Sequence, residues 1–439
     1  VLHGGKNVYT GKGDDLTLPE GSYTYSISCG GYKTANGSFA VKDKAEIVTG
    51  QLTKATAWDG KTLSKPATDK DGIYLIGNGE ELMWFDANAK MTDNARLIAD
   101  ITINEDMRLE ESDLYKWTPI GSYINYNSQT PYQGTFDGNG HRISGLCIKG
   151  KDKNNAAMFG FLGAEGVIKD LTIDGKIITT YARNNYAAGF AGTSKGSIRN
   201  CINYASVSGA ERVGGIAGSS EGTIENCANY GTITASGTRA GGIVGNLQSD
   251  GSEAVKSCFN AGSVTASSFA GGIAGDHYNG GQIANVYNIG EVSSQGYSGG
   301  LLGNFRSGTL TAAYNAGAVS GAEGKTGAII GRLEWNNNNK FVDNAYFAEG
   351  MVASYLGDAN GCILNGVPQQ KDEEGLKAAY TELGEAFASD ITPYRNNGYP
   401  VLKWQIGDSA DSKDPETDPE GWNGTDTAKP KLLDGVYQI

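Results

Sequence analysis

The sequence is poor in the residues that build most catalytic and metal centres. Its 439 residues include only three histidines and six cysteines. Proline is also scarce, with ten residues. None of the cysteines forms a Cys-x-x-Cys pair, which argues against a zinc site and against a small domain held together by disulfides. We therefore expect the cysteines to behave as small buried hydrophobic residues. The sequence predicts no catalytic residues, no metal site and no cofactor.

Charge and hydropathy limit the partners of the chain in a similar way. The net charge is −13 and no block of lysine and arginine occurs, which disfavours nucleic acid and anionic membranes as partners. No run of 18 apolar residues is present, so we expect no membrane insertion. The first residues carry no signal-peptide pattern and resemble the interior of a domain, so we expect the chain to be part of a longer polypeptide.

Glycine is the residue that the sequence has in excess. It accounts for 65 of 439 residues, about 15 % and roughly twice the usual share. Glycine does not recur at every third position, as it does in collagen, and 39 % of the residues are hydrophobic, enough to build a core. Because glycine adopts positive φ angles at little steric cost, this composition favours many short strands joined by tight turns.

A repeat dominates the middle of the chain. One copy reads Ile-Glu-Asn-Cys-Ala-Asn at 224–229, followed by Gly-Gly-Ile-Val-Gly at 241–245. The last asparagine of the first motif recurs at intervals of 26, 31, 28 and 27 residues, as Asn203, Asn229, Asn260, Asn288 and Asn315. The copies lack the helical stretch that ankyrin and leucine-rich repeats need, and they are rich in glycine and β-branched residues. An all-β fold, a parallel β-helix with coils about 4.8 Å apart, is the consistent solution.

Equivalent residues of successive coils should lie directly above one another in such a fold. The first predicted internal column contains Ile198, Ile224, Ile283 and Leu310. The second contains Leu171, Cys201, Cys227, Cys258, Val286, Ala313 and Ala345. The five recurring asparagines form the third, which we expect to be a ladder of hydrogen-bonded side-chain amides. Residues 143–148 and 168–173 are interpreted as weaker, earlier copies of the same motif.

The chain divides into four parts. Residues 1–55 alternate between polar and apolar with period two, which predicts a small, truncated β-sandwich. Residues 56–70 are expected to be a linker and 71–405 the β-helix, with one capping helix starting at Gly79 and a second helix within 372–387. Residues 406–439 are expected to be an acidic linker and the start of another copy, because 422–439 repeat the pattern of 58–76.

Several motifs resemble those of the GLUG-repeat proteins of bacterial surfaces. They are the Gly-Gly-Ile-Ala-Gly type of motif, NCANYGTI at 226–233, SCFNAGSV at 257–264, the entry segment 117–148 and the exit NNGYPVLKWQ at 396–405. The resemblance implies a right-handed β-helix on an extracellular, adhesin-like protein of the bacterial surface or cell wall. Some immunoglobulin A1-cleaving members carry such repeats beside a catalytic domain, but this chain lacks their His-Glu-x-x-His motif. Separately, 21–43 resemble β-sandwich modules of the PEGA or carboxypeptidase-regulatory type.

Two functions remain open on this fold. The favoured one is a non-enzymatic surface module, an adhesin or stalk; the alternative is a polysaccharide-degrading lyase or hydrolase. For the alternative, His141 lies in a predicted turn, and Asp276-His277 could pair with Glu291 as an acid/base or metal site, although a solvated loop is the favoured interpretation. The segment 69–72 (Asp-Lys-Asp-Gly) has only part of the pattern of a calcium loop.

One column of residues suggests a binding surface. Just before each glycine pair, aromatic and cationic residues recur as Tyr186, Arg212, Arg239, Phe269, Tyr297 and Lys325. Aromatic faces and guanidinium groups both bind sugars and acidic groups, so we predict that a glycan or a host or matrix protein binds along this column. The alternative is that these side chains only cover the tips of loops.

Overall fold

The structure is a computed structural model that describes most of the β-helix and parts of the flanking segments. The described residues are 2–3, 6–7, 20–27, 35–42, 57–125, 127–150, 155–179, 186–249, 254–334, 339–352, 354–391, 395–406, 432–433 and 436–437. The chain forms two compact units. One comprises Thr56–Asp372, and the other comprises Val1–Ala55 with Glu373–Ile439.

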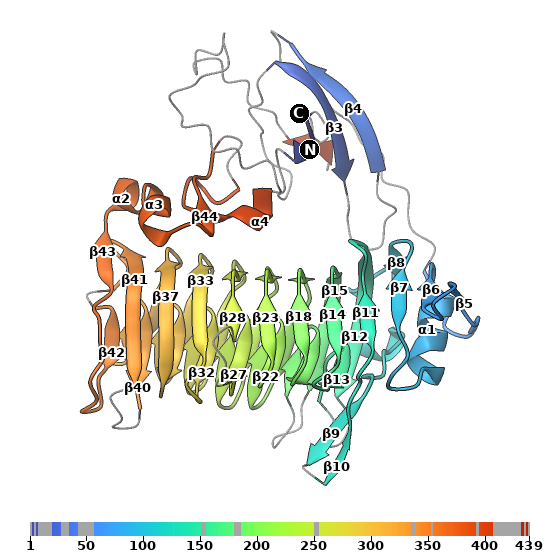
Figure 1. Cartoon of the computed structure of the whole chain (residues 1–439), viewed down its shortest axis with the longest axis horizontal. Coiled ribbons are helices and arrows are strands. Elements are labelled where there is room, and N and C mark those ends of the chain that lie inside the picture. The colour runs from blue at the N-terminus through green and yellow to red at the C-terminus, as the bar shows by residue number, and fades with distance from the viewer. Residues whose placement is uncertain are drawn as a thin grey trace. The chain divides into compact units, whose positions relative to one another are not determined.

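The larger unit is a parallel β-helix of about seven turns, as the repeat predicts (Figure 1). One full coil consists of five short strands: β23 (Thr223–Glu225), β24 (Ala228–Asn229), β25 (Ile233–Ala235), β26 (Arg239–Gly241) and β27 (Val244–Leu247). Each strand pairs in parallel with the equivalent strand of the neighbouring coils. The strands of this coil have only two to four residues because the coil must turn several times within 26 to 31 residues.

The strands of the β-helix form three long sheets. The first has 23 strands, which are, besides β23, β24 and β25, β5 (Ala67–Thr68), β6 (Tyr74–Ile76), β7 (Ala95–Leu97), β8 (Ile101–Thr102), β11 (Thr135–Asp137), β12 (Arg142–Gly150), β14 (Val167–Lys169), β15 (Thr172–Thr179), β18 (Ser197–Arg199), β19 (Ile202–Asn203), β20 (Ser206–Gly209), β28 (Val255–Lys256), β29 (Phe259–Asn260), β30 (Val264–Ala266), β33 (Gln282–Asn288), β34 (Val292–Ser294), β37 (Gly308–Asn315), β38 (Val319–Gly321), β41 (Lys340–Ala348) and β43 (Gln369–Lys371).

The other two sheets of the β-helix have fewer strands. The six-stranded sheet contains, besides β26, β16 (Ala187–Ala188), β21 (Arg212–Gly214), β31 (Phe269–Gly271), β35 (Tyr297–Gly299) and β39 (Thr326–Gly327). The eight-stranded sheet contains, besides β27, β13 (Phe159–Leu162), β17 (Ala191–Ser194), β22 (Ala217–Ser220), β32 (Ala274–His277), β36 (Leu302–Phe305), β40 (Ile330–Leu333) and β42 (Leu356–Asp358). A hairpin of β9 (Ser122–Asn125) and β10 (Ser128–Thr130) projects from an early coil (Figure 1), and η1 (Glu111–Asp113) precedes it.

The helix predicted from Gly79 is present as α1 (Gly79–Asn88). It begins at Asn78, whose side chain accepts a hydrogen bond from the backbone N–H of Glu81 at 3.0 Å, the usual way of satisfying a free helix end. Leu82, Met83 and Phe85 are buried, and the Phe85 ring packs edge-on against Phe136 of β11 at 5.9 Å. The helix therefore covers the first coils and shields apolar residues that would otherwise face water.

The second unit contains short elements. A four-stranded antiparallel sheet consists of β1 (Leu2–His3), β2 (Lys6–Asn7), β3 (Gly21–Ile27) and β4 (Ala35–Val41). The expected sandwich stays a prediction, because most other residues of 1–55 lie outside the described residues. The predicted helix within 372–387 is split into α2 (Glu373–Lys377) and α3 (Tyr380–Leu383), followed by β44 (Phe387–Ala388), β45 (Val401–Leu402) and α4 (Lys403–Ile406).

Antiparallel hairpins occur in both segments whose sequences repeat, with five residues between the paired strands in one and two residues in the other. β5 and β6 pair in antiparallel fashion around Asp71-Gly72, and β46 (Leu432–Leu433) pairs with β47 (Val436–Tyr437) around Asp434-Gly435. Most of 406–439 lies outside the described residues. The domain boundaries and the start of another copy therefore stay predictions.

The predicted internal columns are present. One buried row contains Ile198, Ile224, Ile283 and Leu310, as predicted. The same row also contains Val255, which the repeat pattern did not reveal. The cysteines of the second column, Cys201, Cys227 and Cys258, are fully buried. One register was wrong: Ile143 pairs with Ile173, and Phe136 rather than Ile143 lies beside Ile168. The motif at 143–148 is thus aligned with the strand after the one that the sequence suggested.

The predicted asparagine ladder is formed inside the β-helix. The side-chain amide nitrogen of each asparagine donates to the amide oxygen of the next one, from Asn203 to Asn229 at 2.8 Å, then at 2.7, 2.7 and 2.8 Å to Asn260, Asn288 and Asn315. The same nitrogen also donates to the backbone carbonyl two residues ahead, as Asn260 does to Gly262 at 2.7 Å. All five side chains are completely buried, so each bond replaces water that the amide lost on folding.

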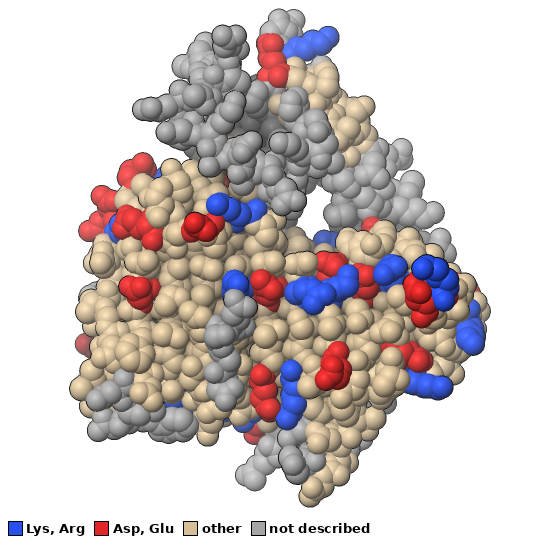
Figure 2. All heavy atoms as spheres, viewed as in Figure 1, with Lys and Arg blue, Asp and Glu red and all other residues tan. Residues whose placement is uncertain are grey.

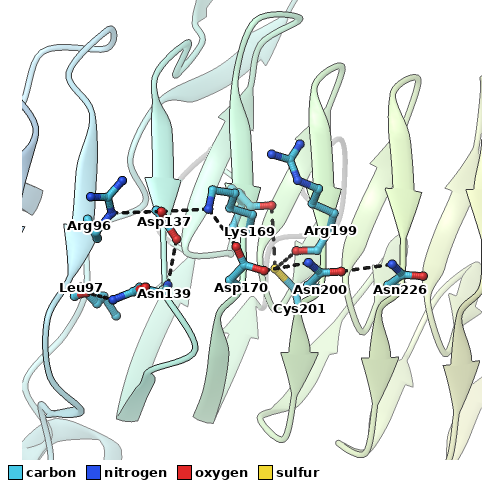
Figure 3. Close-up of polar contacts among 11 residues, drawn as sticks. Arg96, Leu97, Asp137, Asn139, Lys169, Asp170, Arg199, Asn200, Cys201 and Asn226 are labelled. Atoms are coloured by element: carbon cyan, nitrogen blue, oxygen red, sulfur yellow. Dashed lines mark hydrogen bonds and ion pairs between the residues drawn. The ribbon is translucent and has the colours of Figure 1, made fainter. Parts of the chain in front are cut away.

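A second row of polar turns runs along the outside of the 23-stranded sheet. One residue per coil has a positive φ between 47° and 55°: Asn139, Asp170, Asn200, Asn226, Ser257, Asn285, Ala312 and Asn344. Asparagine and aspartate tolerate this left-handed conformation better than other residues with side chains. Asn200 donates to Asp170 at 2.7 Å, and Asn226 donates to Asn200 at 3.2 Å (Figure 3). These turns therefore reinforce the same coil-to-coil register from outside.

Charged residues flank this row in the same register. Arg96, Asp137, Lys169, Arg199, Glu225 and Lys256 occupy equivalent positions in successive strands. Asp137 lies between Arg96 at 3.2 Å and Lys169 at 2.8 Å (Figure 3). In the space-filling view both signs of charge gather in a band over these strands (Figure 2). The ion pairs favour coils stacked in this register because a shift of one residue would separate the partners.

We expect the middle of the asparagine ladder to be more sensitive than its end. Asn260→Ala removes ladder bonds on both sides, so the amide nitrogen of Asn229 and the amide oxygen of Asn288 each lose their ladder partner, whereas Asn315→Ala removes the bond on one side. Buried unsatisfied polar groups cost about 1–3 kcal/mol each, so Asn260→Ala should lower the free energy of unfolding by roughly 2–4 kcal/mol. Urea denaturation followed by circular dichroism measures it. A larger loss for Asn315→Ala would contradict the ladder's role.

Candidate functional site

The six residues predicted to bind a ligand lie in one row on the six-stranded sheet. Arg212, Arg239, Phe269 and Tyr297 are paired directly from strand to strand. Tyr186 immediately precedes β16 and Lys325 immediately precedes β39, so both fall in the same row. We call these six residues the first column. The structure thus confirms that they are aligned; that they bind a ligand stays a prediction.

Several neighbouring side chains of the first column are in contact along the helix axis. The Arg212 guanidinium lies 4.6 Å from the centre of the Tyr186 ring. Phe269 and Tyr297 stack with ring centres 5.5 Å apart and planes 12° from parallel, and the Lys325 ammonium lies 5.3 Å from the Tyr297 ring centre. Apart from the buried Tyr186, these side chains are partly or fully exposed. They therefore form a row of aromatic and cationic side chains, with contacts within its first pair and within its last three members.

A second column lies beside the first, on the eight-stranded sheet, and sequence reasoning missed it. It contains the residue that follows the last glycine of each Gly-Gly-x-x-Gly motif: Ser219, Asn246, Asp276, Asn304 and Arg332. Arg239 of the first column bridges to Asp276 at 2.8 Å, and Arg332 stacks on Tyr297 at 4.9 Å. The two columns are thus in direct contact. Because the chemistry of these residues varies, the only feature that could have revealed the column in the sequence was its constant position after the glycine.

A third column follows two residues later in each coil. It contains Glu221, Gln248, Tyr278, Arg306 and Glu334, whose backbone N–H groups bond to successive coils in one ladder. Gln248 accepts hydrogen bonds from Ser219 at 3.0 Å and from Arg212 at 3.4 Å, which joins all three columns. We call the three columns together the three-column face. Each coil contributes one side chain to each column, so the face repeats its geometry along the axis while its chemistry changes.

Asp276 is the polar centre of the three-column face. Its side chain is completely buried and forms ion pairs with Arg239 at 2.8 Å and Arg306 at 3.0 Å. Asn304 donates to the same carboxylate at 3.1 Å and to Glu334 at 2.7 Å. The interpretation of Asp276-His277 as a solvated loop was therefore wrong. Two guanidiniums and one amide thus enclose the carboxylate, and these contacts fix the positions of the neighbouring side chains.

The pairing of His277 with Glu291 is also wrong. His277 is the last residue of β32 and is completely buried, with its Nε2 2.7 Å from the carbonyl oxygen of Gly281 and its ring stacked on Phe305 at 5.1 Å. Glu291 is exposed and precedes β34 in a different sheet. Burial lowers the pKa of His277 to about 4, although the bond to Gly281 opposes this. The imidazole is therefore neutral at physiological pH and acts as part of the core.

The remaining sequence candidates have structural roles. His141 ends the predicted turn between β11 and β12, and its Nδ1 lies 3.2 Å from Asp100. Asp69 accepts hydrogen bonds from the backbone N–H groups of Asp71 and Ile73 at 2.9 and 3.0 Å, so its carboxylate closes the turn between β5 and β6. Across the described ranges, no group of three or more His, Cys, Asp or Glu side chains is arranged to hold a metal ion.

Comparisons with known proteins support the fold and give partial sequence likeness. No family model matches the chain. A stretch of 195 residues, 44 % of this chain, is 28 % identical to Halomucin of Haloquadratum walsbyi and covers 2 % of that protein. A stretch of 84 residues, 19 % of this chain, is 32 % identical to a protein of Evansella cellulosilytica named "Putative Gly-rich membrane protein" and covers 9 % of it. The chain therefore spans a small fraction of the length of these relatives.

One solved structure has the same architecture. The crystal structure described as that of "a putative immunoglobulin A1 protease from Bacteroides ovatus" aligns with a TM-score of 0.50 and 21 % identity, over 78 % of this chain and 95 % of that chain. At this identity the likeness shows the β-solenoid fold alone. Among the residues that the structure describes, no helix is both long and apolar enough to cross a membrane.

We expect His277 to make the stability of the β-helix depend on pH. The folded chain keeps the imidazole neutral down to about pH 4, whereas an unfolded chain takes up the proton near 6.5. Stability is therefore present above about 6.5 and is lost as the pH falls toward 4, by at most about 3 kcal/mol. His277→Phe, which matches Phe305 in the next coil, should remove this loss. Urea unfolding at pH 7, 5.5 and 4 measures both proteins.

The comparison must be made between the variant and the unaltered protein. Burial raises the pKa of Asp86 to about 7, so this group titrates in the same window with the opposite sign. It contributes equally to both proteins and cancels in the difference. Parallel pH profiles for His277→Phe and the unaltered chain would contradict a buried neutral imidazole.

Proposed function

We propose that this chain is a non-enzymatic module of a bacterial cell-surface protein, an adhesin or stalk that binds glycans or proteins along the three-column face. The observation that carries the proposal is the alignment of the first column, in which Arg212, Phe269 and Tyr297 occupy one surface row. Aromatic faces and guanidinium forks are the groups with which proteins contact sugar rings and acidic groups.

The β-helix suits such a role because it is rigid and repetitive. Every coil hydrogen-bonds to the next through several strands and through the asparagine ladder. Side chains at equivalent positions therefore hold a fixed spacing of about 4.8 Å, which presents an extended ligand with a preorganised row of contacts. A rod with these properties can also act as a spacer that carries binding sites away from a cell.

The resemblance of the repeat motifs to GLUG-repeat proteins and of 21–43 to PEGA-type modules supports an extracellular location and a longer parent chain. Asp276, the buried acid of the face, also supports a non-enzymatic role, because Arg239 and Arg306 occupy its carboxylate. A polysaccharide lyase or hydrolase would need an acid or base with access to its substrate. The enzymatic alternative is tested by the same experiment as binding.

The proposal predicts retention of a ligand without cleavage. The chain is incubated with an array of glycans and matrix proteins, and both retention and the length of the recovered ligands are measured. Saturable retention of uncleaved ligand is expected. The double variant Arg212→Ala/Tyr297→Ala should weaken retention by roughly tenfold or more, because it removes one guanidinium and one aromatic face from the first column.

The matched control is Arg199→Ala, which removes an arginine from the outer surface of the 23-stranded sheet. It should leave retention unchanged. Unchanged retention by Arg212→Ala/Tyr297→Ala would refute the face as the binding surface, and cleavage of a retained glycan would refute the non-enzymatic role.

A further inference from the structure

A hollow opens at the edge of the three-column face. It has a volume of about 280 Å³ and is lined by Glu221, Gln248, Ser249, Tyr278 and Asn279. Three of these residues belong to the third column, one from each of three successive coils. Ligand pockets for drug-sized molecules begin at about 300 Å³, so a space of this size fits a single sugar ring.

The polar side chains around the hollow are held in place by neighbours. Glu221 forms an ion pair with Lys195 at 3.0 Å, and the Gln248 side chain accepts bonds from Ser219 and Arg212. Asn279 donates to the backbone carbonyl of Gln248 at 3.3 Å. Side chains that are already oriented lose less entropy when a ligand binds. The hollow is thus preorganised.

One face of the Tyr278 ring is covered by Arg306, whose guanidinium lies 5.0 Å from the ring centre. Arg306 is itself bound to Asp276 at 3.0 Å and to Glu334 at 3.1 Å. The guanidinium is therefore engaged by two carboxylates and fixes the tyrosine in position. The phenol, the two amides and the serine hydroxyl supply donors and acceptors without net charge.

The acid that lines the hollow and the guanidinium over its tyrosine are both held in ion pairs, so neither is an unpaired charge that would attract an acidic ligand. Among the described residues that line the hollow, the carboxylate belongs to Glu221, and its partner Lys195 lies 3.0 Å away. A carboxylate accepts strong hydrogen bonds from hydroxyl groups but repels a ligand carboxylate or sulfate. Amide and hydroxyl groups bond to the hydroxyls of a sugar as both donors and acceptors.

We infer that this hollow binds one neutral sugar unit of a glycan, with Glu221 and Asn279 as hydrogen-bonding partners of its hydroxyls and Tyr278 as its wall. The inference rests on the proposed function, since the sugar would be one unit of a glycan lying along the three-column face. It adds a substrate class, neutral rather than acidic, and a specific place of contact. Glu221 is 44 % exposed as a side chain and therefore open to a ligand.

The test uses the whole chain and simple probes. Methyl glycosides of glucose, galactose, mannose and N-acetylglucosamine are compared with glucuronate by saturation-transfer difference NMR and by titration. At least one neutral glycoside should bind, with a dissociation constant in the millimolar range that is usual for a contact of this size, roughly −4 kcal/mol. Glucuronate should bind more weakly. Binding of glucuronate alone, or of no probe, would overturn the inference.

The variant Glu221→Gln gives the sharpest result because its two outcomes have opposite signs. If a neutral sugar occupies the hollow, loss of the charged acceptor should weaken binding about threefold to tenfold. If an acidic sugar occupies it, loss of the repulsion should strengthen binding. The matched control Glu225→Gln, on the 23-stranded sheet, should change neither. Circular dichroism establishes that both variants are folded.

Failure of this inference differs from failure of the proposed function. If the chain retains glycans and loses them in Arg212→Ala/Tyr297→Ala, yet Glu221→Gln and Asn279→Ala bind as the unaltered chain does, then the face binds glycans and the hollow does not. If no glycan or protein is retained at all, the proposed function itself fails.

Discussion

The contact between the asparagine ladder and the second glycine of each Gly-Gly pair is the constraint on which the β-helix depends. A Cβ atom on Gly242 would lie 2.3 Å from the Asn260 side-chain carbon, and one on Gly272 would lie 2.4 Å from that of Asn288. The buried amide therefore lies in the volume that the glycine leaves free, and the carbonyl oxygen of the next coil is closer still, 2.1 Å from a Cβ on Gly242, so neither glycine has room for a side chain. Because the amides also bond to one another from coil to coil, this contact fixes how each coil lies on the next. The recurrence of both motifs in every repeat has one physical cause.

The three-column face follows from that register. The first glycine of each pair is equally confined, since a Cβ on Gly241 would lie 2.0 Å from the carbonyl oxygen of Val244. The six- and eight-stranded sheets can thus approach closely, and side chains of the partly exposed first column reach those of the mostly buried second column. Arg239 reaches Asp276 and Arg332 reaches Tyr297 across this turn. The repeat keeps the backbone constant and leaves these outer positions free to vary, which is how one scaffold can carry different ligand-binding surfaces.

Residues that recur with the same chemistry could be predicted from the sequence, whereas residues that recur only in position could not. Asn203 and its equivalents, the stacked cysteines and the first column were predictable because each has a recognisable residue type at a constant interval. Ser219, Asn246 and Arg332 have unrelated side chains, so only their place after a glycine marks them. The place of Val255 in the internal column was not predicted because its coil has 31 residues, which shifts the spacing. The burial of His277 was not predicted because the segment Asp-His-Tyr is polar and resembles a solvated loop. Its burial depends on Phe305 in the next coil, a contact that no local pattern encodes.

The central claim is that residues one repeat apart lie side by side, which a cross-link tests most directly. Paired positions of neighbouring parallel strands are about 4.8 Å apart, within the range that a disulfide spans. The account predicts that Phe269→Cys/Tyr297→Cys, one coil apart, forms a disulfide under mild oxidation, and that Arg239→Cys/Tyr297→Cys, two coils apart, does not. Peptide mass spectrometry identifies the linked residues and separates them from the native cysteines. A disulfide in the second variant and none in the first would contradict the register, and with it the three-column face.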